Sequence, residues 1–158
     1  MPNWLVHLAV AWIIVEIFNL RRYRTVFLLG SVLPDAKMFA MLLSPVIGIT
    51  NSYALALPVH TPFGTTLAAV FAAALFNEKF KKIFILLLLG SITHFALDAT
   101  MYPYYGVGHY LLLYPFSWTQ FGISMYYLTE YLTPVVVVLA VVGTLMRIKF
   151  NNSKEIQK

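Results

Sequence analysis

The stretch Leu86–Asp98, LLLLGSITHFALD, joins an apolar run to two side chains that can bind a metal ion, His94 and Asp98. Their spacing of four residues places both side chains on one face of a helix, on successive turns. A carboxylate and an imidazole inside a lipid-facing segment are costly unless they serve a partner or a function. The other unusual polar residues of the chain are therefore candidates to meet this pair.

The composition predicts a membrane protein. Of the 158 residues, 60% are hydrophobic and 11% are charged, and the mean hydropathy is +0.77, which is too apolar for a soluble domain. The chain has no cysteine, so histidines and carboxylates are the strong metal ligands that remain. The N-terminus lacks a basic start and a small-residue cleavage site, so Leu5–Leu20 is expected to be a retained span rather than a signal peptide.

We expect one all-α domain over residues 1–148, a transmembrane bundle of about five spans, followed by a polar cytoplasmic tail over 149–158. The second span, Thr25–Leu33, is too short to cross alone at about 1.5 Å per residue. It is expected to continue through Pro34 into Met38–Leu43 as a kinked or re-entrant piece. The other expected spans are Trp4–Leu20, Pro62 to about Phe76, the run after Glu78–Lys82 to about Thr100, and about Gly122–Met146.

Two local signals refine this picture. Thr61 is predicted to cap the third span, with Pro62 at the first helical position, where its missing N–H costs nothing. Leu29-Gly30-Ser31 is echoed by Leu89-Gly90-Ser91, which we interpret as matched small-residue packing and a faint sign of an internal repeat.

The basic residues set the orientation. Of the 11 Lys and Arg, all but Lys37 lie in segments 21–24, 78–82 or 147–158. Five alternating spans place these segments on one side, which the positive-inside tendency makes cytoplasmic. The N-terminus is then outside and the C-terminus inside, and the +5 net charge reflects topology rather than nucleic-acid binding.

This topology brings the candidate ligands to one depth. Counted at helical rise from the nearest basic residue, they lie roughly 18–29 Å from the cytoplasmic boundary; these residues are His7, His60, His94 and Asp98. Asp35 follows the Pro34 break at the same side. Imidazoles and carboxylates suit Zn²⁺, with Mn²⁺ or Fe²⁺ as alternatives. Such an ion lowers the pKa of a water ligand to about 7. The expected metal ligands are His7, Asp35, His60, His94 and Asp98.

Other polar residues have competing interpretations. The N–H groups of Phe63–Thr65 could hold a phosphate or an oxyanion, with Thr61 as a catalytic hydroxyl and Thr65 as a substrate contact. Glu130 is an expected general base or a further ligand. His109 is interpreted as an interfacial hydrogen bonder, with substrate contact as the alternative. Glu16 is expected to pair with the 21–24 arginines. For His94 and Asp98 themselves, the alternative is a structural hydrogen bond.

With these residues in view, the chain resembles a family of membrane-bound, metal-dependent hydrolases of bacteria and archaea. The group is labelled inner-membrane-associated and includes a LexA-binding member. The matching segments cover most of the chain and are His7, Leu29–Asp35 with its LPD, Val59–Thr61 at a helix start, Gly90–Asp98 with H-x-x-x-D, and Tyr102–Gly106 followed by Leu113–Ser117.

The resemblance implies a multi-pass protein of the prokaryotic cytoplasmic membrane with a divalent metal cofactor. Members often carry a second Asp and a His where this chain has Ala36-Lys37-Met38, and a His-Arg where Leu55–Pro58 has none, which favours one metal ion over two. A distant similarity to zinc-dependent phospholipase C implies phosphoester chemistry.

We therefore expect hydrolysis of a lipid-linked ester or phosphoester at the outer leaflet, with membrane lipid as the partner. The alternative is a non-catalytic membrane protein with a structural metal site or an ion or proton pathway.

Overall fold

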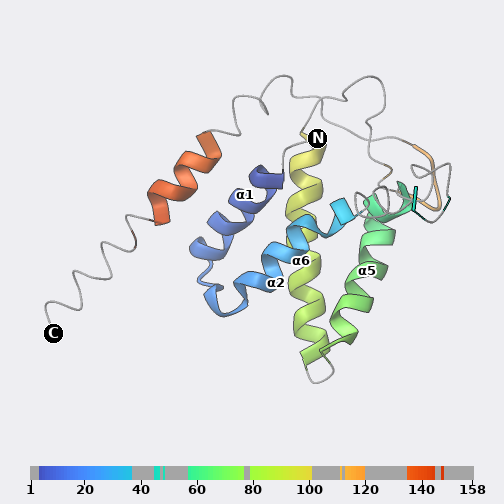
Figure 1. The fold of residues 1–158 in the computed structure, drawn as a ribbon, viewed down its shortest axis with the longest axis horizontal. Coiled ribbons are helices and arrows are strands. Elements are labelled where there is room, and N and C mark those ends of the chain that lie inside the picture. The colour runs from blue at the N-terminus through green and yellow to red at the C-terminus, as the bar shows by residue number, and fades with distance from the viewer. Residues whose placement is uncertain are drawn as a thin grey trace, which may run out of the picture.

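The protein was analysed as a computed structural model that describes residues 4–36, 45–46, 48, 57–76, 79–100, 111, 113–119, 135–144 and 147. Every regular element within these ranges is a helix (Figure 1). The elements are α1 (Trp4–Ile17), the 3₁₀ turn η1 (Arg21–Tyr23), α2 (Arg24–Val32), the 3₁₀ turns η2 (Leu33–Ala36) and η3 (Leu57–His60), α5 (Pro62–Ala74), α6 (Phe80–Ala99) and a C-terminal helix (Val135–Thr144).

Among the described helices, α6 alone is long and apolar enough to cross a membrane. Its 20 residues extend over about 30 Å, the thickness of the hydrocarbon core. The apolar helices α1, α5 and Val135–Thr144 are shorter. The all-helical class is therefore confirmed for the described residues, whereas five spans and their orientation stay a prediction.

The ends of two helices differ from the expected ones. The first helix ends at Ile17, three residues before the expected Leu20, because Asn19 takes a left-handed φ of 55° that asparagine tolerates and a helix does not. The fourth predicted span begins at Phe80 rather than after Lys82. Lysines can lie in a first helical turn at a membrane edge, since their long side chains reach water. The predicted continuation Met38–Leu43 lies outside the described residues.

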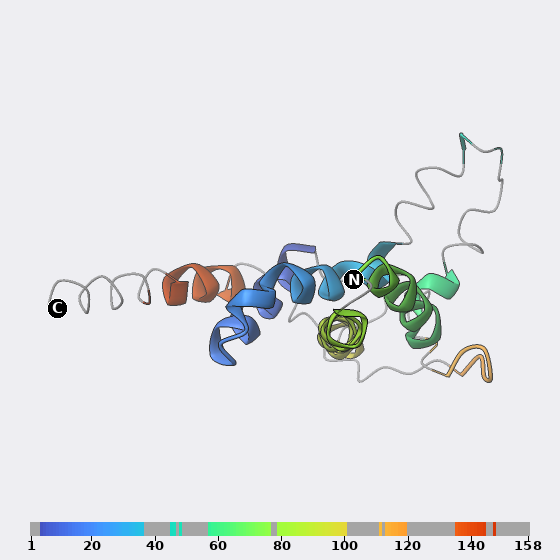
Figure 2. The ribbon, with the colours of Figure 1, turned by 90° about the horizontal axis from the view of Figure 1, so that it is seen from below.

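Helix α6 lies at the centre of the described helices, with α1 and α2 on one side of it and α5 on the other (Figure 1). Figure 2, in which α6 is seen end-on, shows the same neighbours around it. Two apolar clusters fill the spaces on these two sides. Their buried members are Ala11, Val15, Phe27 and Leu86 in one cluster, and Ala69, Ala73, Ile83 and Leu87 in the other.

Two glycines allow α2 and α6 to cross in direct backbone contact. A Cβ atom on Gly30 would lie 2.4 Å from the carbonyl oxygen of Leu87, and one on Gly90 would lie 2.3 Å from that of Phe27. The adjacent Ser91 hydroxyl lies 3.0 Å from the Gly30 carbonyl oxygen and donates to it. The matched packing predicted from the two Leu-Gly-Ser segments is therefore confirmed, since small residues let helix backbones approach closely.

The start of α5 is the one predicted from sequence. Thr61 is the N-cap residue, its hydroxyl oxygen accepts the Gly64 N–H at 3.1 Å, and Pro62 begins the helix. The cap ends the short η3 turn directly at His60, so it determines where that imidazole lies.

At the basic end of the bundle, one carboxylate binds two arginines from distant parts of the chain. Glu16 Oε2 accepts from Arg21 at 2.9 Å and from Arg147 at 2.7 Å. The pairing with a 21–24 arginine was predicted, whereas the sequence did not predict that Arg147 would reach Glu16. Close by, Trp12 donates its indole N–H to the Thr144 hydroxyl at 3.0 Å. These contacts hold the C-terminal helix against α1.

Candidate metal centre

Five imidazole and carboxylate side chains converge at the end of the bundle away from the basic residues. The histidines come from the first turn of α1, from η3 and from α6, and the carboxylates come from η2 and the last turn of α6. All are buried, with exposed fractions of 0% to 6%. They are His7, Asp35, His60, His94 and Asp98.

The centre is built around His60, His94 and Asp98. The Nε2 atoms of His60 and His94 lie 3.1 Å apart, and each lies 3.1 Å from Asp98 Oδ2. Asp35 Oδ1 lies 3.5 Å from His60 Nε2 and 3.9 Å from His94 Nε2. Three elements of the chain, η2, η3 and α6, thus place their donor atoms around one small volume.

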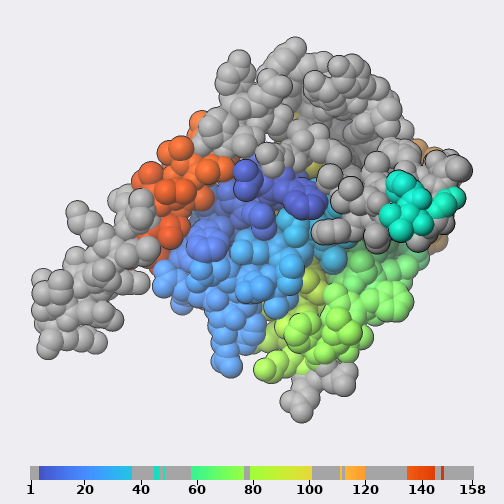
Figure 3. Space-filling model, viewed as in Figure 1, coloured from blue at the N-terminus to red at the C-terminus, as the bar shows by residue number. Residues whose placement is uncertain are grey.

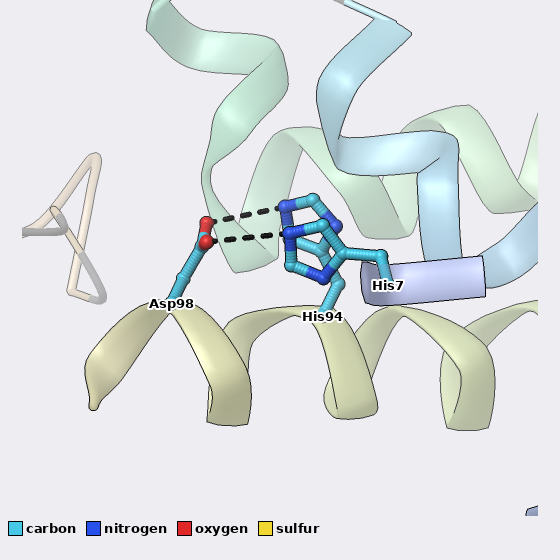
Figure 4. Close-up of side chains that lie close together, drawn as sticks. All are labelled: His7, His94 and Asp98. Carbon is cyan, nitrogen blue, oxygen red and sulfur yellow. Dashed lines mark ion pairs between the residues drawn. The ribbon is translucent and has the colours of Figure 1, made fainter. Parts of the chain in front are cut away.

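His7 completes the group from the side of α1. Its ring is stacked on the ring of His94, with centroids 3.8 Å apart and an angle of 13° between the planes. Its Nε2 lies 3.5 Å from Asp98 Oδ1, whereas His94 faces the other oxygen. Figure 4 shows the two parallel rings directed at the same carboxylate.

Several of these buried atoms have no hydrogen-bond partner. They include both ring nitrogens of His7 and both carboxylate oxygens of Asp98. A buried polar atom without a hydrogen bond is rare and costly, and a divalent cation would satisfy several such donors at once. The residues present therefore fit a metal ion, and two overlapping triads have their ligand atoms within 4.8 Å of one another, His7–His94–Asp98 and Asp35–His60–His94.

The tautomer of His94 is determined by a backbone contact. Its Nδ1 lies 2.7 Å from the carbonyl oxygen of Ser31, so Nδ1 carries the proton and donates it. In a neutral ring this leaves the lone pair on Nε2, which faces His60 and Asp98. Ligating histidines usually donate their second nitrogen in this way, which orients the ring and raises its basicity.

The crossing of α2 and α6 at Gly30 and Gly90 allows the His94 ring to reach the Ser31 carbonyl. Ser31 follows Gly30 in the last turns of α2, and His94 lies one turn beyond Gly90 in α6. Close approach of the two backbones therefore brings a carbonyl of one helix to an imidazole of the other. Sequence reasoning identified the small residues but not the role of the Ser31 carbonyl, since a backbone atom leaves no signal in the residue type.

Two threonine hydroxyls hold the backbone around His60, and a third bonds within α5. Thr61 donates to the Pro58 carbonyl at 2.7 Å, Thr65 donates to the Val59 carbonyl at 2.9 Å, and Thr66 donates to the Pro62 carbonyl at 2.6 Å. The first two bonds connect the start of α5 to η3, which carries His60. Thr66 bonds only within its own helix.

These bonds bear on the roles expected for this segment. Thr61 and Thr65 are 0% and 1% exposed, and both hydroxyls contact backbone rather than an open space. Of the N–H groups expected to hold an anion, Gly64 donates to Thr61 Oγ1 and Thr65 donates to the Thr61 carbonyl. The expectation of free N–H groups there is wrong for these two residues, because the N-cap and the first helical turn use them.

The remaining predicted site residues, Glu130 and His109, lie outside the described residues. Within the described part, the side chains of His60 and Asp35 retain exposed fractions of 6% and 4%, whereas those of His7 and Asp98 are fully covered.

A family model described as YdjM inner membrane protein matches residues 4–156. The chain belongs to this family. The comparisons with curated proteins and with solved structures gave no match. Membership of the YdjM family supports the membrane location that the composition predicts, and its description concerns location rather than chemistry. The feature of the protein that bears on a possible reaction is therefore the buried group of histidines and aspartates.

Proposed function

We propose that this YdjM-family protein is a membrane-integral, metal-dependent hydrolase that acts on a lipid-linked ester or phosphoester. The observation that carries the proposal is the buried group of three imidazoles and two carboxylates, in which His7 and Asp98 have donor atoms without hydrogen bonds. A folded chain tolerates such a group when an ion joins its members.

The spacing of the donors favours a single ion at the His60, His94, Asp35 and Asp98 atoms. Ligands about 2.1 Å from a tetrahedral ion lie about 3.4 Å from one another. The atoms of His60, His94 and Asp98 lie 3.1 Å from one another, and Asp35 lies 3.5 and 3.9 Å from the two imidazole nitrogens, values on both sides of this one. The mixed nitrogen and oxygen donors suit zinc, with manganese and iron as alternatives. When bound, the ion would supply Lewis acidity and a water of lowered pKa.

The residues of the chain would perform the supporting steps. His94 presents Nε2 because its Nδ1 proton is held by the Ser31 carbonyl, and His60 is held by the η3–α5 turn. Asp98 is shared between His7 on one oxygen and His60 and His94 on the other. This arrangement leaves the side of His60 and Asp35 for a substrate, with Glu130 and His109 as proposed contributors of a general base and a substrate contact.

The position of the centre along α6 favours a lipid-linked substrate. His94 and Asp98 lie about 18 and 24 Å from Lys82 at helical rise. With the lysine at one face of a hydrocarbon core about 30 Å thick, the centre lies in the opposite half of the core, about 6–12 Å from its other face. Ester and phosphate groups of lipids begin at that other face, which in the proposed topology belongs to the outer leaflet.

An ion or proton pathway is the less favoured alternative. A pathway needs polar groups that continue from the centre toward the other face of the membrane. The described space between the centre and the basic end is filled by the two apolar clusters, whose members include Val15, Phe27 and Leu87. A closed structural metal site is the other alternative, and it is distinguished by whether the ion keeps a position for water.

Hydrolysis is tested with purified protein in mixed micelles that contain a phospholipid or a diacyl ester. The activity should disappear on chelation, return with added zinc or manganese, and be absent in Asp98→Asn. Glu16→Gln provides a matched carboxylate control, because Glu16 pairs with arginines at the other end of α1. Activity that survives chelation or Asp98→Asn would contradict the proposal.

The structural-site alternative is tested by cobalt substitution. A catalytic centre should change its visible spectrum when a small anion such as azide is added, because the anion enters an open position. A closed site with protein ligands only should give a spectrum that the anion does not alter.

A further inference from the structure

A second candidate site lies on another face of α1, away from the metal centre. A cavity of about 390 Å³, open on one side, lies between α1 and the C-terminal helix Val135–Thr144. Figure 3 shows this helix seated against α1 at the edge of the molecule. The cavity is lined by Leu5, Leu8, Ala9, Trp12, Val137, Ala140, Val141 and Thr144.

The walls of this cavity accept only an apolar ligand. Seven of the eight lining residues are hydrophobic, and the exception, Thr144, has its hydroxyl engaged. The hydroxyl oxygen accepts the Trp12 indole N–H and the hydroxyl donates to the Ala140 carbonyl at 2.7 Å. The volume of the cavity lies within the range of small-molecule sites.

The basic end of the cavity carries an excess of positive charge. The Arg24 guanidinium lies over the Trp12 ring, 4.4 Å from its centroid. One turn beyond Trp12, Glu16 pairs with both Arg21 and Arg147. Among the described ion pairs, the one carboxylate here faces the guanidiniums of Arg21 and Arg147, whereas that of Arg24 contacts the Trp12 ring, so this end of the cavity carries a net positive charge. Arginine is suited to phosphate because its N–H groups can bind two oxygens at once.

We propose that this cavity binds an anionic phospholipid. One acyl chain lies between α1 and the C-terminal helix, and the phosphate lies at Arg24 in the leaflet on the basic side. Membership of an inner membrane protein family places a bilayer against these helices, and basic side chains at a membrane surface attract anionic lipids. The site is separate from the proposed catalytic centre and does not depend on it.

The proposal is tested through Trp12, which lines the cavity and can report on lipids by fluorescence quenching. The protein carrying Trp4→Phe and Trp118→Phe is placed in vesicles of equal phosphatidylglycerol and phosphatidylcholine, with brominated acyl chains on one lipid or the other. Brominated phosphatidylglycerol should quench Trp12 more strongly, with an enrichment of about fivefold for one arginine.

Four variants in the same background assign the effect to the two parts of the site. Arg24→Gln should remove much of the preference for the anionic lipid, whereas Arg24→Lys should retain it. Ala140→Phe fills the cavity and should reduce quenching by both brominated lipids. Leu139→Phe is its control, because Leu139 is 59% exposed on the same helix and does not line the cavity.

Each contrary result overturns the proposal. Equal quenching by the two lipids would mean that ordinary boundary lipid touches Trp12 without charge selection. Absence of quenching by either would mean that protein, from this chain or from a second copy, covers the cavity. Loss of metal through His94→Ala should leave the lipid preference unchanged, so failure of the hydrolase proposal would be recognised separately.

Discussion

Replacing Gly90 with alanine should weaken metal binding although Gly90 contributes no ligand. The new Cβ would lie 2.3 Å from the Phe27 carbonyl oxygen and 2.7 Å from the Ser31 N, whereas ordinary contact begins at 3.4 Å. The helices α2 and α6 must therefore separate by about 1 Å to avoid overlap, at a cost of about 1–3 kcal/mol for overpacking. The 2.7 Å contact between His94 and the Ser31 carbonyl would lengthen past about 3.5 Å, the limit of a hydrogen bond.

Loss of the partner that orients a ligating histidine typically lowers metal affinity about 10–100-fold. The measurement is a competition titration of the purified protein against a chromophoric chelator in detergent. Unfolding of the metal-free protein by sodium dodecyl sulfate, followed by circular dichroism, measures the packing cost separately. Gly30→Ala should behave like Gly90→Ala, because its Cβ would lie 2.4 Å from the Leu87 carbonyl oxygen.

Gly143→Ala is the matched control, since a Cβ there would meet no atom within 4 Å. It should bind metal as the wild type does. A folded Gly90→Ala protein with wild-type metal affinity would refute the reasoning, because it would show that the His94 ring does not depend on the helix crossing. Equal losses in Gly90→Ala and Gly143→Ala would refute it as well.

Three further predictions concern the support of His60, the ligand Asp98 and the basic end of the bundle. Thr65→Val removes the hydroxyl that holds the Val59 carbonyl and should weaken metal binding about 10-fold in the same titration. Thr65→Ser keeps a hydroxyl and should restore the affinity. Thr66→Val removes a bond within α5 only and should have no effect. Asp98→Asn should abolish high-affinity metal binding yet preserve the helical circular dichroism, because the side chain keeps its shape. The hydrogen bond from Lys82 lowers the pKa of the exposed Tyr23 phenol, so its phenolate should form below the usual value of about 10 and stabilise the fold as the pH rises. The titration of Tyr23 is obtained from the phenolate absorbance of a protein minus that of the same protein with Tyr23→Phe. In Lys82→Met this titration should lie at higher pH than in the wild type, and an unchanged titration would contradict the prediction.

Much of the candidate centre follows from local sequence rules. The H-x-x-x-D spacing places His94 and Asp98 on one helix face whatever surrounds them, and the Thr61-Pro62 pair begins α5 directly after His60. Apolar segments that alternate with basic turns then bring the ends of several helices to one side. These signals depend only on short stretches of chain, which is why they could be read without a structure.

The rest depends on contacts between distant segments. The stacking of His7 on His94 and the contact between His94 and the Ser31 carbonyl require the crossing angle and register of separate helices, which residue types do not specify. The expectation of free N–H groups at the start of α5 is wrong for Gly64 and Thr65, because Thr61 and the first helical turn use them. The pairing of Arg147 with Glu16 was likewise missed, since it joins opposite ends of the chain.

The metal content of the purified protein tests the account most directly. Wild type, His94→Ala, Asp98→Ala and the Glu16→Gln control would be purified without chelators and analysed by elemental analysis. The account predicts about one zinc, manganese or iron ion per chain in wild type and in Glu16→Gln, and loss of the ion in the other two. A folded wild-type protein that holds no ion even after metal is added back would contradict the account, and His94 and Asp98 would then be a structural hydrogen-bonded pair.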